Sequence, residues 1–244
     1  MNGLLIDTSG SPPGRSGRQM LEDWFGPLLG TVDHIDLSAV AASAPDCGPR
    51  ALAAGAVVLT GSSLDAHSLD AVVLRLIKTV QVLAERNIPV LGVCFGHQLL
   101  ARALGGTVGR NPSGWEVGNV RISLTEAGLA CPILTDLGAE PTMLQSHQDA
   151  VLALPPGGVL LAGNSHTPIQ AFQSRQSGRQ FGVQFHPEFT PERLQKNWVE
   201  RRERLRGTTF FDLDQQLDEA RPTPDTASLL RRFFDFAARE GAAS

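Results

Sequence analysis

Apolar runs alternate with amphipathic helical segments in the first half of the chain, and this alternation limits the possible folds more than any other feature. Residues 55–60 and 88–93 are almost entirely apolar, as parallel strands covered on both faces require. Between these two runs, residues 69–83 carry apolar side chains at helical spacing, and Asn87 is expected to end that helix. The order of strand, helix and strand predicts a parallel sheet with helices on both faces.

Other patterns predict further elements before and after this unit. The apolar segments beyond residue 116 are short and predict an antiparallel extension of the sheet. Thr190 followed by Pro191 favours a helix start, so a helix is predicted from there toward residue 206. The other predicted strands are residues 4–7, 32–37, 117–124, 143–145, 159–162, 169–172 and 181–185. The other predicted helices are 18–29, 226–239 and one that follows Cys94 and stops at Gly105.

Composition excludes several classes of protein. The 244 residues are 42% hydrophobic and 19% charged, which is typical of a globular chain rather than a disordered one. The longest apolar runs are shorter than the roughly 18 residues that a membrane-spanning helix needs, and the N-terminus does not resemble a secretory signal. We therefore expect a cytoplasmic protein with no membrane partner. A formal net charge of −4 argues against a nucleic-acid partner.

The three cysteines, Cys47, Cys94 and Cys131, lie far apart and form no C-x-x-C pair. This spacing fits neither a disulfide framework nor a zinc site, and we expect no metal and no cofactor. Cys47 and Cys131 are interpreted as small buried side chains. Cys94 has a different sequence context, which suggests a chemical role.

Residues 92–96 have the form G-x-C-x-G, which is the thiol version of the G-x-S-x-G nucleophile elbow. The motif lies between a predicted strand and a predicted helix, as an elbow requires. The partial positive charge of the helix N-terminus favours a thiolate at Cys94. The elbow also offers the backbone N–H of Phe95 to an oxyanion. Cys94 is therefore the candidate nucleophile.

A second motif supplies the other two groups of a triad. Residues 181–185 form a predicted strand that ends at His186, and Glu188 follows two residues later. A histidine at this position can take the thiol proton, and a neighbouring carboxylate can hold the imidazole in the required orientation. His97, next to the elbow, is instead interpreted as a core or pocket-rim residue. The sequence therefore predicts a catalytic triad of Cys94, His186 and Glu188.

With these two motifs the sequence resembles the class I glutamine amidotransferases, which use a Cys-His-Glu triad. The similarity rests on residues 92–101, 104–106 and 182–188, and it extends from Leu4 to about Arg206. It implies an α/β fold with a flavodoxin-like, open and mostly parallel sheet and a small antiparallel extension. We expect one such domain over residues 1–206, with residues 207–244 forming a C-terminal helical segment packed on it.

The resemblance also implies roles for residues outside the triad. A second oxyanion donor is expected from the backbone of Gly61 or Ser62, in the loop after the third strand. Gln98 resembles a position that contacts the substrate, although a solvated helix residue is the alternative. Ser146 and His147 resemble a segment that holds the amino-acid end of glutamine through its main chain. The pair of residues 115–116 could line the pocket or simply pack.

Three functions remain open at this point. The resemblance favours hydrolysis of the γ-amide of glutamine through a thioester on Cys94, with release of ammonia to a possible synthetase partner chain. Residues 60–66, 114–118 and 145–149 resemble stand-alone relatives of the GMP synthase amidotransferase domain, including γ-glutamyl peptidases. A hydrolase of γ-glutamyl compounds is therefore the second candidate. The third, a non-catalytic regulatory protein, is disfavoured by the intact triad motifs.

Overall fold

The computed structural model describes residues 1–9, 19, 21–25, 35–175, 178–205, 213–223, 226 and 228–242. Most of the helix predicted over 18–29 lies outside the described residues, and within them Leu21–Phe25 form a short π-helical turn, η1. Part of the strand predicted over 32–37 also lies outside them. The described strand in that region begins later, at Asp36.

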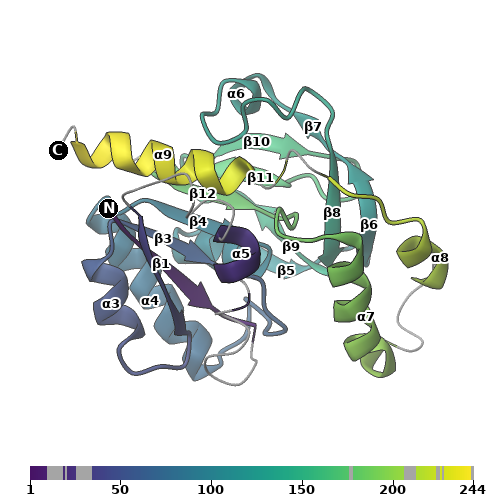
Figure 1. The fold of residues 1–244 in the computed structure, drawn as a ribbon, viewed down its shortest axis with the longest axis horizontal. Coiled ribbons are helices and arrows are strands. Elements are labelled where there is room, and N and C mark those ends of the chain that lie inside the picture. Colours follow the sequence, from purple (N-terminus) through teal and green to yellow (C-terminus); the bar gives the residue numbers. More distant parts are fainter. Residues whose placement is uncertain are drawn as a thin grey trace.

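An eight-stranded sheet forms the centre of the molecule (Figure 1). Its first five strands are parallel and the last three are antiparallel. In spatial order the strands are β2 (Asp36–Ala41), β1 (Asn2–Asp7), β3 (Ala56–Leu59), β4 (Val90–Val93), β12 (Gln180–Val183), β11 (Ala171–Gln173), β10 (Val159–Gly163) and β7 (Ser123–Leu124). The predicted mostly parallel sheet is confirmed.

Helices cover both faces of this sheet, because successive side chains of a strand point to opposite sides. In β1, Leu4 and Ile6 pack with α3 (Cys47–Ala53), α4 (Ala71–Glu85) and α5 (Phe95–Ala103). Leu5 faces the other way, into the core that includes five buried side chains of α9 (Ser228–Ala242). Figure 1 shows α9 on one side of the sheet and α3 and α4 on the other.

The ends of α4 show where sequence patterns were accurate and where they were not. Asn87 has φ 55° and follows the last turn, as a residue that ends a helix in the left-handed region does. Leu69 was predicted on the buried stripe, but its side chain is 79% exposed. The reason is that Asp70 caps the helix by accepting a hydrogen bond from the Val72 N–H at 2.7 Å, so Leu69 precedes the helix.

The antiparallel extension consists of β10, β11, β7 and two further pairs of strands. One pair is β5 (Thr107–Arg110) with β9 (Asp149–Ala153), and the other is β6 (Glu116–Arg121) with β8 (Thr142–His147). The single strand predicted over 117–124 is wrong, because β6 and β7 belong to different sheets and Ile122 lies between them. Two short helices were not predicted: α3 and α6 (Glu126–Leu129).

The C-terminal third adds a smaller core beside β6 and β8. Helix α7 (Pro191–Leu205) begins where the sequence predicted, and the Thr190 hydroxyl accepts a hydrogen bond from the Arg193 N–H at 3.3 Å. Together with α8 (Leu213–Asp218) it packs on these strands. Trp198 is fully buried there, and its indole N–H donates to the Ser146 hydroxyl at 2.9 Å. Residues beyond 206 thus contact both the smaller core, through α8, and the main sheet, through α9.

Candidate active site

Cys94 lies at a sharp turn between β4 and α5. Its φ of 52° and ψ of −102° are rarely adopted by a residue with a side chain, so the surrounding structure must hold this strained conformation. A Cβ added to Gly92 would overlap the Gly96 carbonyl, and one added to Gly96 would overlap the Leu59 carbonyl. The two flanking glycines are therefore required by the close approach of backbone around the turn.

The other two cysteines do not share this environment. Cys47 and Cys131 are buried and unpaired, as expected from their spacing. Burial raises the pKa of both thiols, which disfavours the reactive thiolate. Cys94 is thus the cysteine that the fold places at a turn and at the wall of a cavity.

His186 follows β12 and contacts both Cys94 and Glu188. Its Nδ1 lies 2.7 Å from Glu188 Oε1, its ring stacks on Phe189 with centroids 3.9 Å apart, and Cys94 lies close enough to act on its pKa. Burial lowers the pKa of His186, but the charges of Glu188 and Cys94 and their hydrogen bonds raise it to about 10. The arrangement therefore favours the protonated form of the His186 ring.

Glu188 is almost completely buried, with 4% of its side chain exposed. Among the described residues no donor reaches its second oxygen, Oε2. The carboxylate is therefore directed at His186 and makes no other hydrogen bond within that part of the chain. This geometry fits a group that orients the imidazole and stabilises its protonated form.

A cavity of about 410 Å³ opens beside Cys94 and lies within the range of small-molecule sites. The structure brings most of the predicted site residues to its walls. Gly61 lies next to it, since a Cβ added to Gly61 would lie 3.7 Å from Cys94 Cβ and 2.9 Å from His186 Cε1. The predicted site residues that line the cavity are Ser62, Cys94, Phe95, Gln98, Ser146 and His147.

Gln98 is buried rather than solvated. Its side-chain amide donates to the Asp149 carbonyl at 2.8 Å and to Gln184 Oε1 at 3.1 Å. The alternative interpretation as an exposed helix residue is therefore wrong, because α5 packs against β9 at this turn. Gln98 both lines the cavity and fixes the backbone that follows His147.

A buried hydrogen-bonded group around Glu116 supports the far wall of the cavity. Glu116 lies directly opposite His147 in the pairing of β6 with β8, and its Oε2 lies 2.9 Å from His147 Nε2. Three further side chains donate to this carboxylate: Asn164, Thr167 and Gln170. Burial raises the pKa of Glu116, but the hydrogen bond and charge of His147 and the bonds from Asn164 and Thr167 outweigh burial and lower it.

The sequence indicated part of this group but not its role. Residues 115–116 were considered for the pocket, and Trp115 does line the cavity, where it packs edge-on against Trp198 with ring centroids 5.2 Å apart. Glu116 acts instead beneath the surface, through His147. Glu116 and His147 meet only because of the register between β6 and β8, and no local sequence pattern predicts that register.

Charged residues at the mouth of the cavity were missed by the sequence analysis. Arg110 lies opposite Asp149 in the pairing of β5 with β9, and its Nη1 donates to Asp149 Oδ1 at 2.8 Å. His67 Nδ1 lies 3.3 Å from the other Asp149 oxygen, and Asp65 lies 3.4 Å from Arg110. Burial raises the pKa of Asp149, while Arg110 and His67 act against this rise.

The sequence predicted that His97 is either a core residue or a pocket-rim residue. It lies in the core and does not line the cavity. Its ring packs against Phe172, and burial lowers its pKa to about 3. A base that stays neutral and has no access to the cavity cannot exchange protons with a ligand there. His186 is therefore the candidate base.

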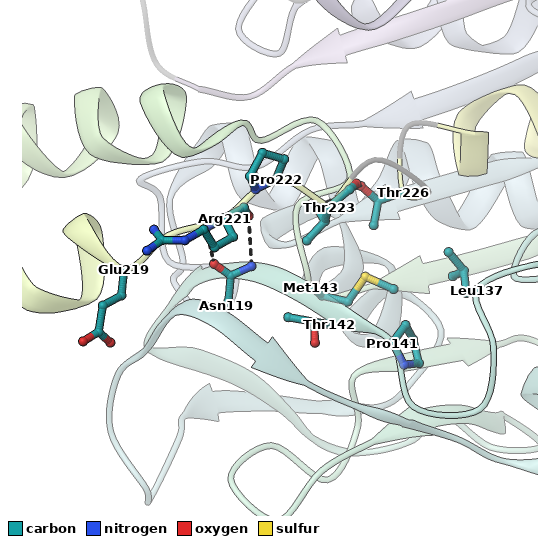
Figure 2. A pocket seen from close by; sticks show the side chains of 10 residues that line it. All are labelled: Asn119, Leu137, Pro141, Thr142, Met143, Glu219, Arg221, Pro222, Thr223 and Thr226. Carbon is teal, nitrogen blue, oxygen red and sulfur yellow. Dashed lines mark hydrogen bonds between the residues drawn. The ribbon is translucent and has the colours of Figure 1, made fainter.

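Figure 2 shows a different cavity of about 450 Å³, between β8 and the segment that follows α8. Asn119 and Arg221 exchange two hydrogen bonds at its edge, of 3.0 Å and 2.6 Å. Its described lining contains neither cysteine nor histidine: Asn119, Leu137, Pro141, Thr142, Met143, Glu219, Arg221, Pro222, Thr223 and Thr226. The nucleophile and the base both lie elsewhere, so the candidate active site is the cavity at Cys94.

The described parts of the chain contain neither a metal-binding cluster nor a membrane-spanning helix. No cluster of three or more His, Cys, Asp or Glu side chains within these ranges could hold a metal ion. None of the described helices has the length and apolar character needed to cross a bilayer.

Comparisons with known proteins give a consistent result. A family model described as Glutamine amidotransferase class-I matches residues 50–203, more than half of the chain. Gamma-glutamyl peptidase 4 of Arabidopsis thaliana is 35% identical over 122 residues, which are 49% of this chain and 49% of that protein. A glutamine-hydrolyzing GMP synthase of Aeropyrum pernix is 34% identical over 198 residues, which are 80% of this chain and 35% of that protein.

The fold has a close counterpart among solved structures. A glutamine amidotransferase of Thermotoga maritima superposes with a TM-score of 0.74 at 18% sequence identity, and the match covers 97% of both chains. The chain spans about half or less of the length of the two curated relatives.

Proposed function

Because the chain belongs to the class I glutamine amidotransferase family, we propose that it is an enzyme that hydrolyses the γ-amide of glutamine through a thioester on Cys94. One observation carries the proposal. Cys94, held at a strained turn beside a cavity, lies next to His186, which in turn lies 2.7 Å from Glu188. A nucleophile, a base and an orienting carboxylate in this order are the parts that acyl transfer needs.

The first step forms the thioester. The Cys94 thiolate attacks the γ-carbonyl carbon of glutamine, and the tetrahedral intermediate collapses with cleavage of the carbon–nitrogen bond. Glu188 faces Nδ1 of His186, so the other ring nitrogen protonates the departing amide nitrogen. Ammonia leaves and a γ-glutamyl group remains on the sulfur.

The second step returns the enzyme to its starting state. His186, now neutral, takes a proton from water as the water attacks the thioester carbonyl. The carbon–sulfur bond breaks, glutamate leaves, and Cys94 regains its thiolate beside a protonated His186. The same side chain thus acts first as acid and then as base.

Both tetrahedral intermediates carry a negative oxygen that needs donors already in place. Phe95, Gly61 and Ser62 lie around Cys94, and among the described residues none of their backbone N–H groups donates to a protein acceptor. Unpaired N–H groups beside the nucleophile are what an oxyanion site offers. We assign this role to the Phe95 N–H together with Gly61 or Ser62.

The remaining wall residues are assigned to the amino-acid end of the substrate. Ser146 and His147 are the last residues of β8, and their side chains are hydrogen-bonded to the Trp198 and Glu116 side chains behind the wall. The Gln98 side-chain amide donates to the Asp149 carbonyl and so fixes the backbone that follows His147. This rigid wall supports main-chain recognition of an α-amino acid.

A second candidate function is hydrolysis of γ-glutamyl peptides or related compounds. The similarity to Gamma-glutamyl peptidase 4 favours it, whereas the similarity to GMP synthase favours release of ammonia to a synthetase partner. The thioester chemistry at Cys94 is the same in both. The leaving group and the presence of a partner distinguish them.

The test uses the purified chain with glutamine and, separately, with γ-glutamyl dipeptides. We expect release of ammonia or of the free amine, and loss of that release in Cys94→Ala. The conservative control is Cys131→Ala, which removes a thiol outside the cavity and should retain activity. Hydrolysis by Cys94→Ala at the wild-type rate would overturn the proposal. Turnover of glutamine only after addition of a synthetase would select the first function over the second.

A further inference from the structure

We propose that Thr8 is a positioning residue that turns the backbone N–H groups of Gly61 and Ser62 toward Cys94. The inference rests on the proposed function, since it concerns the charge that develops in that reaction. Thr8 follows β1 and is separated from the loop by more than fifty residues of sequence. Its side chain does not line the cavity, and its role acts through the backbone.

The hydroxyls of Thr8 and Thr60 form a buried pair beneath the loop. Thr8 Oγ1 lies 2.8 Å from the Thr60 carbonyl oxygen and 3.0 Å from that of Gly61. Thr60 Oγ1 accepts the Thr8 N–H at 2.9 Å and can donate to the Gly61 carbonyl at 3.2 Å. Two hydroxyl protons therefore serve two carbonyls, and both threonines are at least 98% buried.

These bonds reverse the normal alternation of a strand. The Thr60 N–H donates to the Ile6 carbonyl, so Thr60 still faces β1. In a continued strand the Gly61 carbonyl would face the opposite neighbour, β4. It is instead turned back toward Thr8. Two successive carbonyls, those of Thr60 and Gly61, thus accept from the one Thr8 hydroxyl.

The direction of the N–H groups follows from the planar trans peptide. In such a peptide the N–H points opposite to the carbonyl of the preceding residue. The N–H groups of Gly61 and Ser62 therefore both point away from the Thr8 hydroxyl. Thr8 follows β1, and in the sheet order β1, β3, β4 the opposite side is that of β4, whose last residue, Val93, precedes Cys94. Two adjacent N–H groups facing one side form a concave site for an anion.

The Thr60 carbonyl also connects the loop of Gly61 and Ser62 to the elbow at Cys94. The Gly96 N–H donates to the Thr60 carbonyl at 3.2 Å, and Gly96 follows Phe95, which offers the other candidate N–H. The loop and the elbow, which supply the candidate oxyanion donors, are thus both hydrogen-bonded to the Thr60 carbonyl oxygen or adjacent to it. Loss of the Thr8 hydroxyl would leave one carbonyl with less support and allow the Gly61–Ser62 peptide to turn toward its normal strand direction. A carbonyl oxygen would then face the developing charge in place of an N–H.

The test compares Thr8→Val, which keeps the shape but lacks the hydroxyl, with Thr8→Ser, which keeps the hydroxyl. We expect Thr8→Val to lower kcat for γ-amide hydrolysis by about 10- to 100-fold with little change in KM. This is less than the roughly 10²- to 10³-fold loss typical for removal of a whole oxyanion donor. Thr8→Ser should restore most of the activity. Thr79→Val, which removes a hydroxyl from the surface of α4, is the matched control.

A second readout separates this role from a general loss of structure. Alkylation of Cys94 by iodoacetamide displaces iodide from a methylene carbon and forms no oxyanion. Its rate should therefore be the same in Thr8→Val and wild type, provided that both are folded by circular dichroism. If Thr8→Val does not fold, Thr60→Val is measured in the same way with the same expectation.

The outcomes are distinct. A fall in kcat with unchanged alkylation and recovery in Thr8→Ser supports the inference. Equal kcat in wild type and Thr8→Val, or equal losses of hydrolysis and alkylation, overturns it while leaving the proposed function intact. A wild-type protein that alkylates at Cys94 but hydrolyses no γ-glutamyl compound overturns the proposed function, and this inference with it.

Discussion

At the scale of single residues, the candidate site depends on three side chains whose charges stabilise one another. His186 is buried, which disfavours its charged form, yet Cys94 and Glu188 raise its pKa to about 10. The His186 ring therefore binds its proton more tightly in the folded chain than in the unfolded one. The consequence is a dependence of stability on pH that can be worked out from the direction of the shift.

The first prediction concerns this dependence. A raised pKa in the folded state contributes stability that is complete below about 6.5, the value of a free histidine, and is lost as pH rises toward 10. The free energy of unfolding of wild type should therefore decrease over this window. Glu188→Gln removes one of the two charges that raise the pKa, so the decrease should be shallower. Urea unfolding of both proteins between pH 6 and 10 measures it.

The same substitution should also reduce catalysis. Replacing the carboxylate by an amide in a related triad costs about 10⁴-fold in kcat, and we expect a loss of about 10²-fold or more here. Glu192→Gln, on the exposed first turn of α7, is the control for loss of one negative charge nearby. Parallel stability curves for wild type and Glu188→Gln would contradict the assigned role of the carboxylate.

At the scale of elements, the turn between β4 and α5 places the nucleophile. It can form only because the backbone of Gly96 lies against Gly92 and that of Leu59 lies against Gly96. Cys94 then has φ 52° and ψ −102°, a strained conformation that this packing must hold in place. The strand and helix on either side therefore hold the strained turn that places Cys94 at the wall of the cavity.

The second prediction tests this packing. Gly92→Ala places a methyl group into the Gly96 backbone and should destabilise the protein by about 3 kcal/mol or more, because backbone cannot move aside as a flexible side chain does. Gly241→Ala in α9 is the matched control, since a Cβ there meets nothing within 4 Å. Thermal unfolding of both variants decides the matter. Equal melting temperatures would show that the turn is not held as tightly as the structure indicates.

Sequence patterns predicted the elements whose signals are local. The buried strands β3 and β4, the helix between them and the elbow after β4 were each recognisable from apolar runs, spacing or a motif. The triad residues were proposed from the same local motifs. These signals lie within about ten neighbouring residues, so they can be read without knowledge of the fold.

The parts that the sequence did not predict depend on pairing between distant segments. Arg110 meets Asp149, and Glu116 meets His147, only because of the registers of two short antiparallel pairs. Thr8 meets Gly61 only because β1 and β3 are neighbours. Strands of four to six residues give weak periodic signals, and their partners cannot be deduced from either strand alone.

At the scale of the whole molecule, the C-terminal helix completes the core that supports the site. Helix α9 lies on the face of the sheet opposite α3 and α4 (Figure 1), and Phe233 contributes a fully buried ring beside Phe181 of β12. β12 leads directly to His186. Helix α9 therefore packs directly on the strand that leads to the candidate base, His186.

The third prediction follows from this contact. Phe233→Ala should reduce the free energy of unfolding by about 3 to 5 kcal/mol, the usual cost of truncating a buried aromatic side chain. Asp235→Ala, on the exposed side of the same helix, should change it by less than about 0.5 kcal/mol. Urea denaturation followed by fluorescence compares them. A negligible effect of Phe233→Ala would mean that α9 is not part of the core on which we expect it to pack.

The central claim is that Cys94 carries the γ-glutamyl group during turnover, and intact-mass spectrometry tests it most directly. Acid-quenched samples of the protein with glutamine or a γ-glutamyl dipeptide should contain a species heavier by one γ-glutamyl group, and peptide mapping should assign the added mass to Cys94. The adduct should accumulate further in His186→Ala if deacylation slows more than acylation. Steady turnover without any adduct on Cys94, or an adduct mapped to another residue, would contradict the account.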